Sequence, residues 1–307
     1  MIETNIPLIR GAASERAEQS PAPAPTPTRP PNRSIGAILV DAGRLSADNA
    51  ERILRLQHER GQSFGETALS LGLLTQADIE LGLSRQFEFP YLLRGQSQVS
   101  HEIIAAYDPF SAQAESLRAL RSQLMLRWFN GNERHTSLAI TSPERNEGRS
   151  FLAANLAVVF SQLGERTLLI DADLRNPRQH AMFGLSNRSG LSAILSERGD
   201  SDAIVRIPAL VELSVLPAGA IPPNPQELLA RPRFQQLLDE LAQSYDVILI
   251  DTPAANLCAD AQSVAARAGA ALVVARNDAS HIRALNTLVD SMNQAGTFVV
   301  GTVLDEF

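Results

Sequence analysis

Residues 137–164 read SLAITSPERNEGRSFLAANLAVVFSQLG, which predicts an apolar strand, a polar loop and an apolar helix. In such a turn, the N–H groups and the dipole at the start of the helix bind anions, phosphate above all. The loop ends in Gly148-Arg149-Ser150, whereas the common phosphate-binding loop ends in Gly-Lys followed by Ser or Thr. Asn146 stands where that loop has a glycine, and asparagine tolerates a positive φ better than most residues. The sequence therefore predicts a phosphate site with an unusual loop.

Apolar strands and amphipathic helices alternate through the rest of the chain. We predict strands at 137–141, 167–171, 213–217, 246–250, 271–275 and 298–304. Their apolar runs are continuous, as in strands that are buried on both faces. The predicted fold class is α/β, a doubly wound parallel sheet with right-handed crossovers, preceded by a small helical repeat domain. Ligands of such sheets bind at the carboxyl ends of the strands.

Acidic residues follow two of the predicted strands. Asp171 and Asp173 come at the end of the strand at 167–171, and Asp251 follows the strand at 246–250. Parallel strands bring these ends to the edge that carries the phosphate loop. Mg²⁺ with nucleotide phosphates is the simplest partner for carboxylates at that edge. The alternative is that each aspartate caps the helix after its strand, but the convergence of three strand ends favours the cation site.

The composition excludes several classes of protein. The 307 residues suffice for about two domains, and the net charge of −7 argues against broad nucleic-acid binding. All 27 basic residues are arginine, which excludes a Schiff base and a lysine general base. The single cysteine, Cys258, excludes an intramolecular disulfide. We find no signal-peptide core and no apolar run of the ~20 residues that cross a bilayer, so the expected location is cytoplasmic.

Two further segments precede the α/β region. Residues 1–33 contain PAPAPTPTRPP and are predicted to be a disordered tail, either a spacer or a proline-rich ligand. Residues 34–57 and 63–86 are repeats of equal length, each with glycines in matching positions and a Ser or Thr after the second glycine. Such glycines end helices, and such hydroxyls begin them. We therefore predict a helical domain at 34–91 and a linker at 92–108.

A helix predicted at about 110–129 carries Glu115, Arg118 and Arg121 on one face. Taken alone, these residues form a solvated face with an internal ion pair that stabilises little.

Taken together, these motifs resemble those of the bacterial tyrosine kinases. Residues 142–151, 168–178 and 247–254 resemble the Walker A, Walker A′ and Walker B elements of that family, and 216–229 resemble its loop before Walker B. Glu115, Arg118 and Arg121 match its ExxRxxR element, which implies contact with a neighbouring subunit. The resemblance covers about 109–307, a P-loop kinase-like domain. Within the family, the chain resembles the chain-length-determinant kinases of the EpsG type.

The resemblance implies ATP and Mg²⁺ as cofactors and assigns roles by position. The residues implied to bind the nucleotide are Asn146, Glu147, Gly148, Arg149, Ser150 and Phe151. Those implied to hold the metal are Ser150, Asp171 and Asp251, and those implied to be catalytic are Asp171, Asp173 and Arg149. The family also implies a homo-oligomer and a membrane-bound polysaccharide chain-length determinant that recruits the protein to the inner membrane.

Two departures from the family leave two functions open. The chain ends in GTVLDEF, where the family carries a cluster of tyrosines, and Arg149 replaces the lysine. One function is an ATP-dependent protein tyrosine kinase that regulates exopolysaccharide synthesis and chain length. The other is a nucleotide-binding regulator with little phosphotransfer, related to the ParA and MinD ATPases. If the protein phosphorylates itself, we expect Tyr107 in the predicted linker to be the internal site.

The repeats resemble the N-terminal domain of type II secretion ATPases, the MshEN type, some of which bind cyclic di-GMP. Ser34 and Ser63 stand where those binders have a basic residue. We therefore expect weak or no binding of cyclic di-GMP, and the alternative function for this domain is docking.

Overall fold

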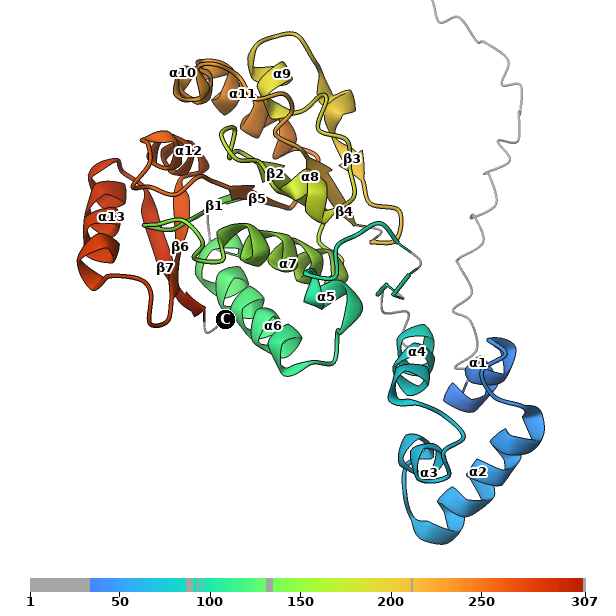
Figure 1. Cartoon of the computed structure of the whole chain (residues 1–307). Coiled ribbons are helices and arrows are strands. Elements are labelled where there is room, and N and C mark those ends of the chain that lie inside the picture. The colour runs from blue at the N-terminus through green and yellow to red at the C-terminus, as the bar shows by residue number, and fades with distance from the viewer. Residues whose placement is uncertain are drawn as a thin grey trace, which may run out of the picture.

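The computed structural model describes residues 34–305, apart from 87–90, 93, 96, 131–134 and 211. The tail predicted at 1–33 lies outside the described residues. A sheet of seven strands lies between two layers of helices (Figure 1), and its spatial order is β3-β4-β2-β5-β1-β6-β7. The strands are β1 (Ser137–Thr141), β2 (Thr167–Asp171), β3 (Val205–Arg206), β4 (Leu213–Leu216), β5 (Val247–Asp251), β6 (Ala270–Arg276) and β7 (Phe298–Asp305).

The predicted fold class is confirmed. All neighbouring strands pair in parallel except β3, which runs antiparallel to β4 at the edge of the sheet. The six predicted strands all form, with ends within a residue of prediction. The sequence did not reveal β3, because two exposed residues are too few to show a period.

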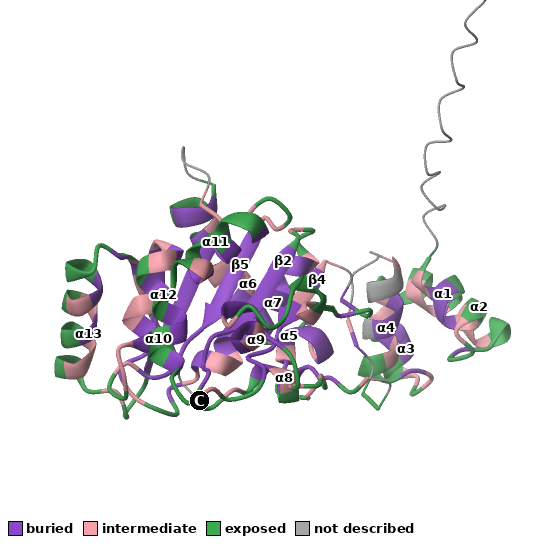
Figure 2. Ribbon diagram, turned by 90° about the horizontal axis from the view of Figure 1, so that it is seen from above, coloured by how far each residue is buried: buried purple, intermediate pink, exposed green. Residues whose placement is uncertain are grey.

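Side chains along the buried strands alternate between two hydrophobic cores. Leu138 and Ile140 of β1 lie in the core covered by α5, α6 and α7, whereas Ala139 faces the opposite core. Figure 2 shows the buried strands between the more exposed outer helices. The helices of the first layer are α5 (Ile104–Tyr107), α6 (Ala112–Leu124), which continues into a π-helical turn at Met125–Phe129, and α7 (Arg149–Gln162). The other helices of the α/β region are α8 (Gln179–Met182), α9 (Leu191–Leu195), α10 (Pro225–Ala230), α11 (Pro232–Leu241), α12 (Asp260–Ala268) and α13 (Ile282–Gln294).

Helix α7, which follows the phosphate loop, is buried almost all round. Apolar residues cover its whole circumference, because the sheet packs on one side and α5 and α6 pack on the other. An apolar surface all round is typical of a helix that is buried inside the protein. Within the described part of the chain, no helix is both long enough and apolar enough to pass through a bilayer.

Residues 97–108 pack against α7, so the linker prediction is wrong for this segment. The Tyr107 side chain is 4% exposed, and its hydroxyl donates to the Val99 carbonyl at 2.6 Å. Asn155 of α7 accepts a hydrogen bond from the Ala105 N–H at 2.9 Å. The segment packs because its apolar side chains cover the outer side of α7. Tyr107 is therefore poorly placed as a phosphorylation site.

The two sequence repeats form two similar helix pairs. They are α1 (Ile35–Asp41), α2 (Ala47–Arg60), α3 (Phe64–Ser70) and α4 (Gln76–Gln86). The glycines that end α1 and α3, Gly43 and Gly72, have φ of 67° and 63°, which L side chains rarely adopt. Ser46 caps α2, and Thr75 makes the corresponding turn with Asp78. The four helices share a hydrophobic core of their own, with Leu39, Ile53 and Phe64 among its members.

Candidate functional site

The phosphate loop lies between β1 and α7. Asn146 has a φ of 61°, as its place in the loop required, and Gly148 has a φ of 87° at the N-terminus of α7. A Cβ at Gly148 would collide with the Asp305 carboxylate at the end of β7. The positive φ therefore favours glycine here, and a Cβ would in addition require the Asp305 side chain to move. The lack of a side chain also lets an anion approach the backbone closely.

The Arg149 side chain points into the protein and binds its own loop. Its Nε donates to the Thr252 carbonyl at 3.0 Å, and its Nη1 donates to the Glu144 carbonyl at 2.7 Å and to the Ser142 hydroxyl. The residue is 9% exposed. In this structure the guanidinium therefore joins the phosphate loop to the segment after β5. Its predicted contact with phosphate stays a prediction.

Glu147, another predicted nucleotide-binding residue, also points inward. It is buried, and its Oε2 accepts from the Glu144 N–H at 2.6 Å while its Oε1 accepts from the Ser280 hydroxyl. Arg276, at the end of β6, donates to the Asn146 carbonyl at 3.3 Å. The Glu147 side chain therefore fixes the shape of the loop and leaves only its backbone for a ligand.

Two buried carboxylates face each other at the carboxyl end of the sheet. Asp171 and Asp251 are paired in register on β2 and β5, and both are fully buried. Burial, together with the charge of Asp251, raises the pKa of Asp171 well above its usual range. Burial raises the pKa of Asp251 to about 6, although the hydrogen bond from Gln179 and the charge of Arg149 oppose this. Two such groups favour a bound cation, because its charge offsets their mutual repulsion.

The oxygen atoms at this edge of the sheet suit Mg²⁺, which prefers oxygen ligands. Asp251 Oδ1 and Gln179 Oε1 are buried oxygens without a hydrogen-bond partner. Ser150 of the phosphate loop lies near enough to Asp251 for its side chain to lower the pKa of that carboxylate. The described residues contain no group of three His, Cys, Asp or Glu side chains that could hold a metal by themselves. Mg²⁺ in nucleotide sites is held by one or two carboxylates together with substrate phosphates, so the set suffices.

Sequence reasoning missed Gln179. Its Nε2 donates to Asp251 Oδ2 at 2.7 Å and to the Ser150 carbonyl at 3.0 Å, and its backbone N–H donates to Asp171 Oδ2 at 2.9 Å. It lies eight residues beyond Asp171, after the turn, and no motif used above marks that position.

Asp173 and Arg175 shape the turn after β2. Asp173 Oδ1 accepts hydrogen bonds from the N–H groups of Arg175, at 3.2 Å, and Asn176, at 2.8 Å. Arg175 forms an ion pair with the buried Asp260 at the start of α12, at 2.8 Å. Asp173 therefore orders the turn, and its predicted catalytic role stays a prediction.

A cavity of about 570 Å³ opens beside the first turn of α7. Phe151 and Leu152 line it together with residues of α6, β6 and β7, and Asp305 is among the lining residues. Its size is that of a small-molecule pocket. Phe151, a predicted nucleotide-binding residue, thus lies between the phosphate loop and an apolar cavity.

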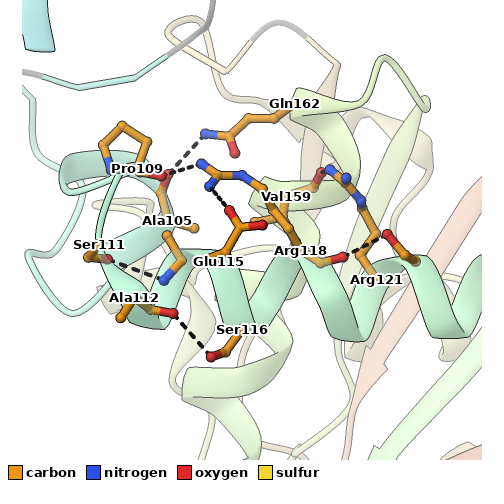
Figure 3. A network of polar contacts seen from close by, with 12 residues as sticks. Ala105, Pro109, Ser111, Ala112, Glu115, Ser116, Arg118, Arg121, Val159 and Gln162 are labelled. Carbon is orange, nitrogen blue, oxygen red and sulfur yellow. Dashed lines mark hydrogen bonds and ion pairs between the residues drawn. The ribbon is translucent and has the colours of Figure 1, made fainter.

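The predicted interface residues already have contacts within the chain (Figure 3). Arg118 pairs with Glu115 at 2.8 Å and donates to the Pro109 carbonyl. Arg121 Nη1 donates to the Val159 carbonyl of α7 at 2.8 Å. Glu115 remains the exposed member, with 73% of its side chain accessible. A role between subunits stays a prediction for all three residues.

A phosphate loop between a central strand and a buried helix, with buried carboxylates at the ends of two neighbouring strands, defines a P-loop nucleotide-binding protein. Residues 136–295 match the family model described as cellulose biosynthesis protein BcsQ. The tyrosine-protein kinase YwqD of Bacillus subtilis is 39% identical over 166 residues, which are 54% of this chain and 69% of that protein. The tyrosine-protein kinase wzc of Salmonella typhimurium is 34% identical over 66% of this chain, but the match spans only 28% of that protein.

Among solved structures, the kinase domain of the Escherichia coli tyrosine kinase ETK matches with a TM-score of 0.65 and 30% identity, over 71% of this chain and 85% of that chain. The chain belongs to the bacterial tyrosine kinase family, and its α/β region to the family that the BcsQ model describes.

Proposed function

We propose that the protein is an ATP-dependent protein tyrosine kinase that requires Mg²⁺ and acts in exopolysaccharide synthesis. The observation that carries the proposal is the in-register pair of buried carboxylates, Asp171 and Asp251, beside Ser150. The relatives named as tyrosine kinases support the reaction. Family resemblance supports a membrane-bound chain-length determinant as the partner that brings the protein to the membrane.

Each part of the site has a role in this proposal. The backbone of 146–149 and the N-terminus of α7 bind the phosphates, and the cavity beside Phe151 receives the nucleoside. Ser150, Asp171 and Asp251 hold Mg²⁺, whose charge offsets that of the phosphates. Asp171 or Asp173 orients the tyrosine hydroxyl and accepts its proton, since phosphoryl transfer needs mainly positioning and charge stabilisation.

The inward position of Arg149 favours a second candidate, a nucleotide-binding regulator with little phosphotransfer. A guanidinium engaged with Thr252, Glu144 and Ser142 is not free to follow the phosphates during transfer. The backbone and the carboxylates would still bind Mg²⁺-ATP. The two candidates therefore share a binding site and differ in the transfer step.

One assay separates the two candidates. The full chain is incubated with γ-labelled ATP and a tyrosine-containing copolymer, with Asp251→Asn as the control, while nucleotide binding is followed by fluorescence. Label on tyrosine that Asp251→Asn abolishes supports the kinase. Binding of ATP without transfer, with and without the membrane partner, supports the regulator. An absence of binding would contradict both.

A further inference from the structure

Gln179 connects three parts of the site with one side chain. It is the first residue of α8 and fully buried, and its amide nitrogen contacts Asp251 on β5 and Ser150 on α7. Its backbone N–H contacts Asp171 on β2. These contacts explain the NH₂ end of the side chain but not its carbonyl oxygen, which is buried without a hydrogen-bond partner.

The orientation of the Gln179 amide follows from its partners. Asp251 Oδ2 and the Ser150 carbonyl only accept hydrogen bonds here, and only the NH₂ end of an amide can donate to both. The carbonyl oxygen, Oε1, must then point away from both, and it is buried with no partner. Asp251 Oδ1 on the adjoining side chain is also buried and without a partner. Buried oxygens of this kind are costly unless something positive or donating lies against them.

We propose that Gln179 is a positioning residue of the divalent-cation site, with its Oε1 accepting a hydrogen bond from the hydrated cation while its NH₂ holds Asp251. The inference rests on the proposed nucleotide site and adds a residue to it. Binding of the hydrated cation would then provide a partner for both Gln179 Oε1 and Asp251 Oδ1. Mutation of a residue that hydrogen-bonds to a metal ligand typically lowers metal affinity by about 10–100-fold.

Only an amide provides both a hydrogen-bond donor to Asp251 and Ser150 and an uncharged acceptor oxygen for the cation site. A carboxylate at 179 would add a third negative charge beside Asp171 and Asp251, and it would lose the donor to Asp251 and Ser150. A leucine would fill the space but would provide neither donor nor acceptor. Glutamine therefore gives the cation an oxygen without a further charge.

The test measures metal binding apart from catalysis. Mn²⁺ is titrated into the full chain with ADP and followed by electron paramagnetic resonance, and ADP affinity is measured with excess Mg²⁺ and with EDTA. The variants are Gln179→Leu and Gln179→Glu. The matched control is Gln162→Leu, because Gln162 donates to the Ala105 carbonyl at 2.9 Å at the far end of α7.

We expect Gln179→Leu to weaken Mn²⁺ binding about 10–100-fold and to leave ADP affinity in EDTA within about two-fold of the native value. Gln162→Leu should leave both quantities unchanged. For Gln179→Glu, which keeps an acceptor oxygen, we expect Mn²⁺ affinity at least as high as that of the native protein, with weaker ADP binding in EDTA.

Other results would overturn the inference. Native Mn²⁺ affinity in Gln179→Leu would show that Oε1 does not serve the cation. If Gln179→Leu lost equal ADP affinity in EDTA and in excess Mg²⁺, the role of Gln179 would be merely structural. If the native protein itself bound ADP and Mn²⁺ while either of these results was obtained, the proposed nucleotide site would stand and only the role of Gln179 would be refuted. If the native protein bound neither, the proposed function would fail first.

Discussion

Arg149 Nε donates a hydrogen bond to the carbonyl of Thr252, 3.0 Å away, and so connects the phosphate loop to the end of β5. A lysine in the same place has no second nitrogen to reach this carbonyl and Glu144 together. The contacts of the loop therefore suit arginine better than lysine.

We predict that Arg149→Lys lowers both nucleotide affinity and stability. The lost hydrogen bonds leave buried acceptors unsatisfied, which costs about 1–3 kcal/mol. Urea unfolding and titration with a fluorescent ATP analogue measure the two effects. Arg145→Lys, at an exposed position of the same loop, is the control and should change little. Faster transfer with unchanged affinity in Arg149→Lys would show instead that arginine impairs an ordinary site.

Arg149→Ala should weaken nucleotide binding under either interpretation, because the loop loses its anchor as well as a charge. Equilibrium dialysis with ATP measures the effect. Affinity equal to that of the native protein would mean that residues 142–150 are not the phosphate loop.

Alanine substitutions at the residues of the predicted interface should differ in their effect on stability. Arg121 is half-buried and donates to the Val159 carbonyl, so Arg121→Ala should destabilise the monomer by about 1–3 kcal/mol. Glu115→Ala, at an exposed position, should change stability by less than about 0.5 kcal/mol. Sedimentation of Glu115→Ala is therefore the clean test of assembly. A shift toward monomer at unchanged melting temperature would support the interface, and an unchanged mass distribution would support a solvated face.

Tyr107 should carry no phosphate after incubation with ATP. Its hydroxyl is buried and donates to the Val99 carbonyl, so a kinase cannot reach it without unfolding the segment. Peptide mass spectrometry should find phosphotyrosine on a partner protein or nowhere. Tyr107→Phe should cost about 1 kcal/mol of stability and leave total phosphate unchanged. Stoichiometric phosphate at Tyr107 would contradict the buried position.

The sequence predicted the elements that obey a period or a motif. The strands were recognisable because both faces are buried, and Asp171 and Asp251 because parallel strands end at one edge. The positive φ of Asn146 followed from the spacing of the loop.

The contacts made by single side chains across the fold could not be predicted. Arg149 has the spacing of a phosphate-binding residue, but its direction depends on carbonyls of the loop and of β5. Gln179 reaches Asp251 from 72 residues away in sequence. Residues 97–108 had the composition of a linker, and only the apolar outer side of α7 explains why they pack.

The repeat region should fold by itself as residues 34–86. Its helices enclose their own hydrophobic core, in which Phe64 lies against Gly36. Circular dichroism of this fragment should show a cooperative helical transition, and Phe64→Ala should abolish it, because removing such a ring costs about 3–5 kcal/mol. If the isolated fragment is unfolded, the folding of this region depends on the rest of the chain.

The same region should show weak or no binding of cyclic di-GMP in calorimetry. Submicromolar binding would overturn that expectation.

Asp251→Asn should stabilise the metal-free protein at high pH and not at low pH. The pKa of Asp251 is about 6 in the folded protein, against an ordinary value of 3.8. Between these values the folded state binds the proton more tightly than the unfolded state, so its stability falls as pH rises through this window and stays lower above it. Asparagine carries no charge to desolvate and still accepts the hydrogen bond from Gln179. We therefore expect a gain of about 1–3 kcal/mol at pH 8 and little difference near pH 4.

Thermal unfolding in EDTA at the two pH values measures this effect. Asp246→Asn is the control, because Asp246 is partly exposed and bonded to Arg166 at 2.6 Å, so its removal should bring no gain at pH 8. With saturating Mg²⁺-ADP, the native protein should be more stable than Asp251→Asn. A ligand that binds the folded state stabilises it, and the Asp251 carboxylate then faces a cation. A loss of stability in Asp251→Asn that is the same at both pH values would show that the paired carboxylates carry no unfavourable charge and would remove the main reason for placing a cation between them.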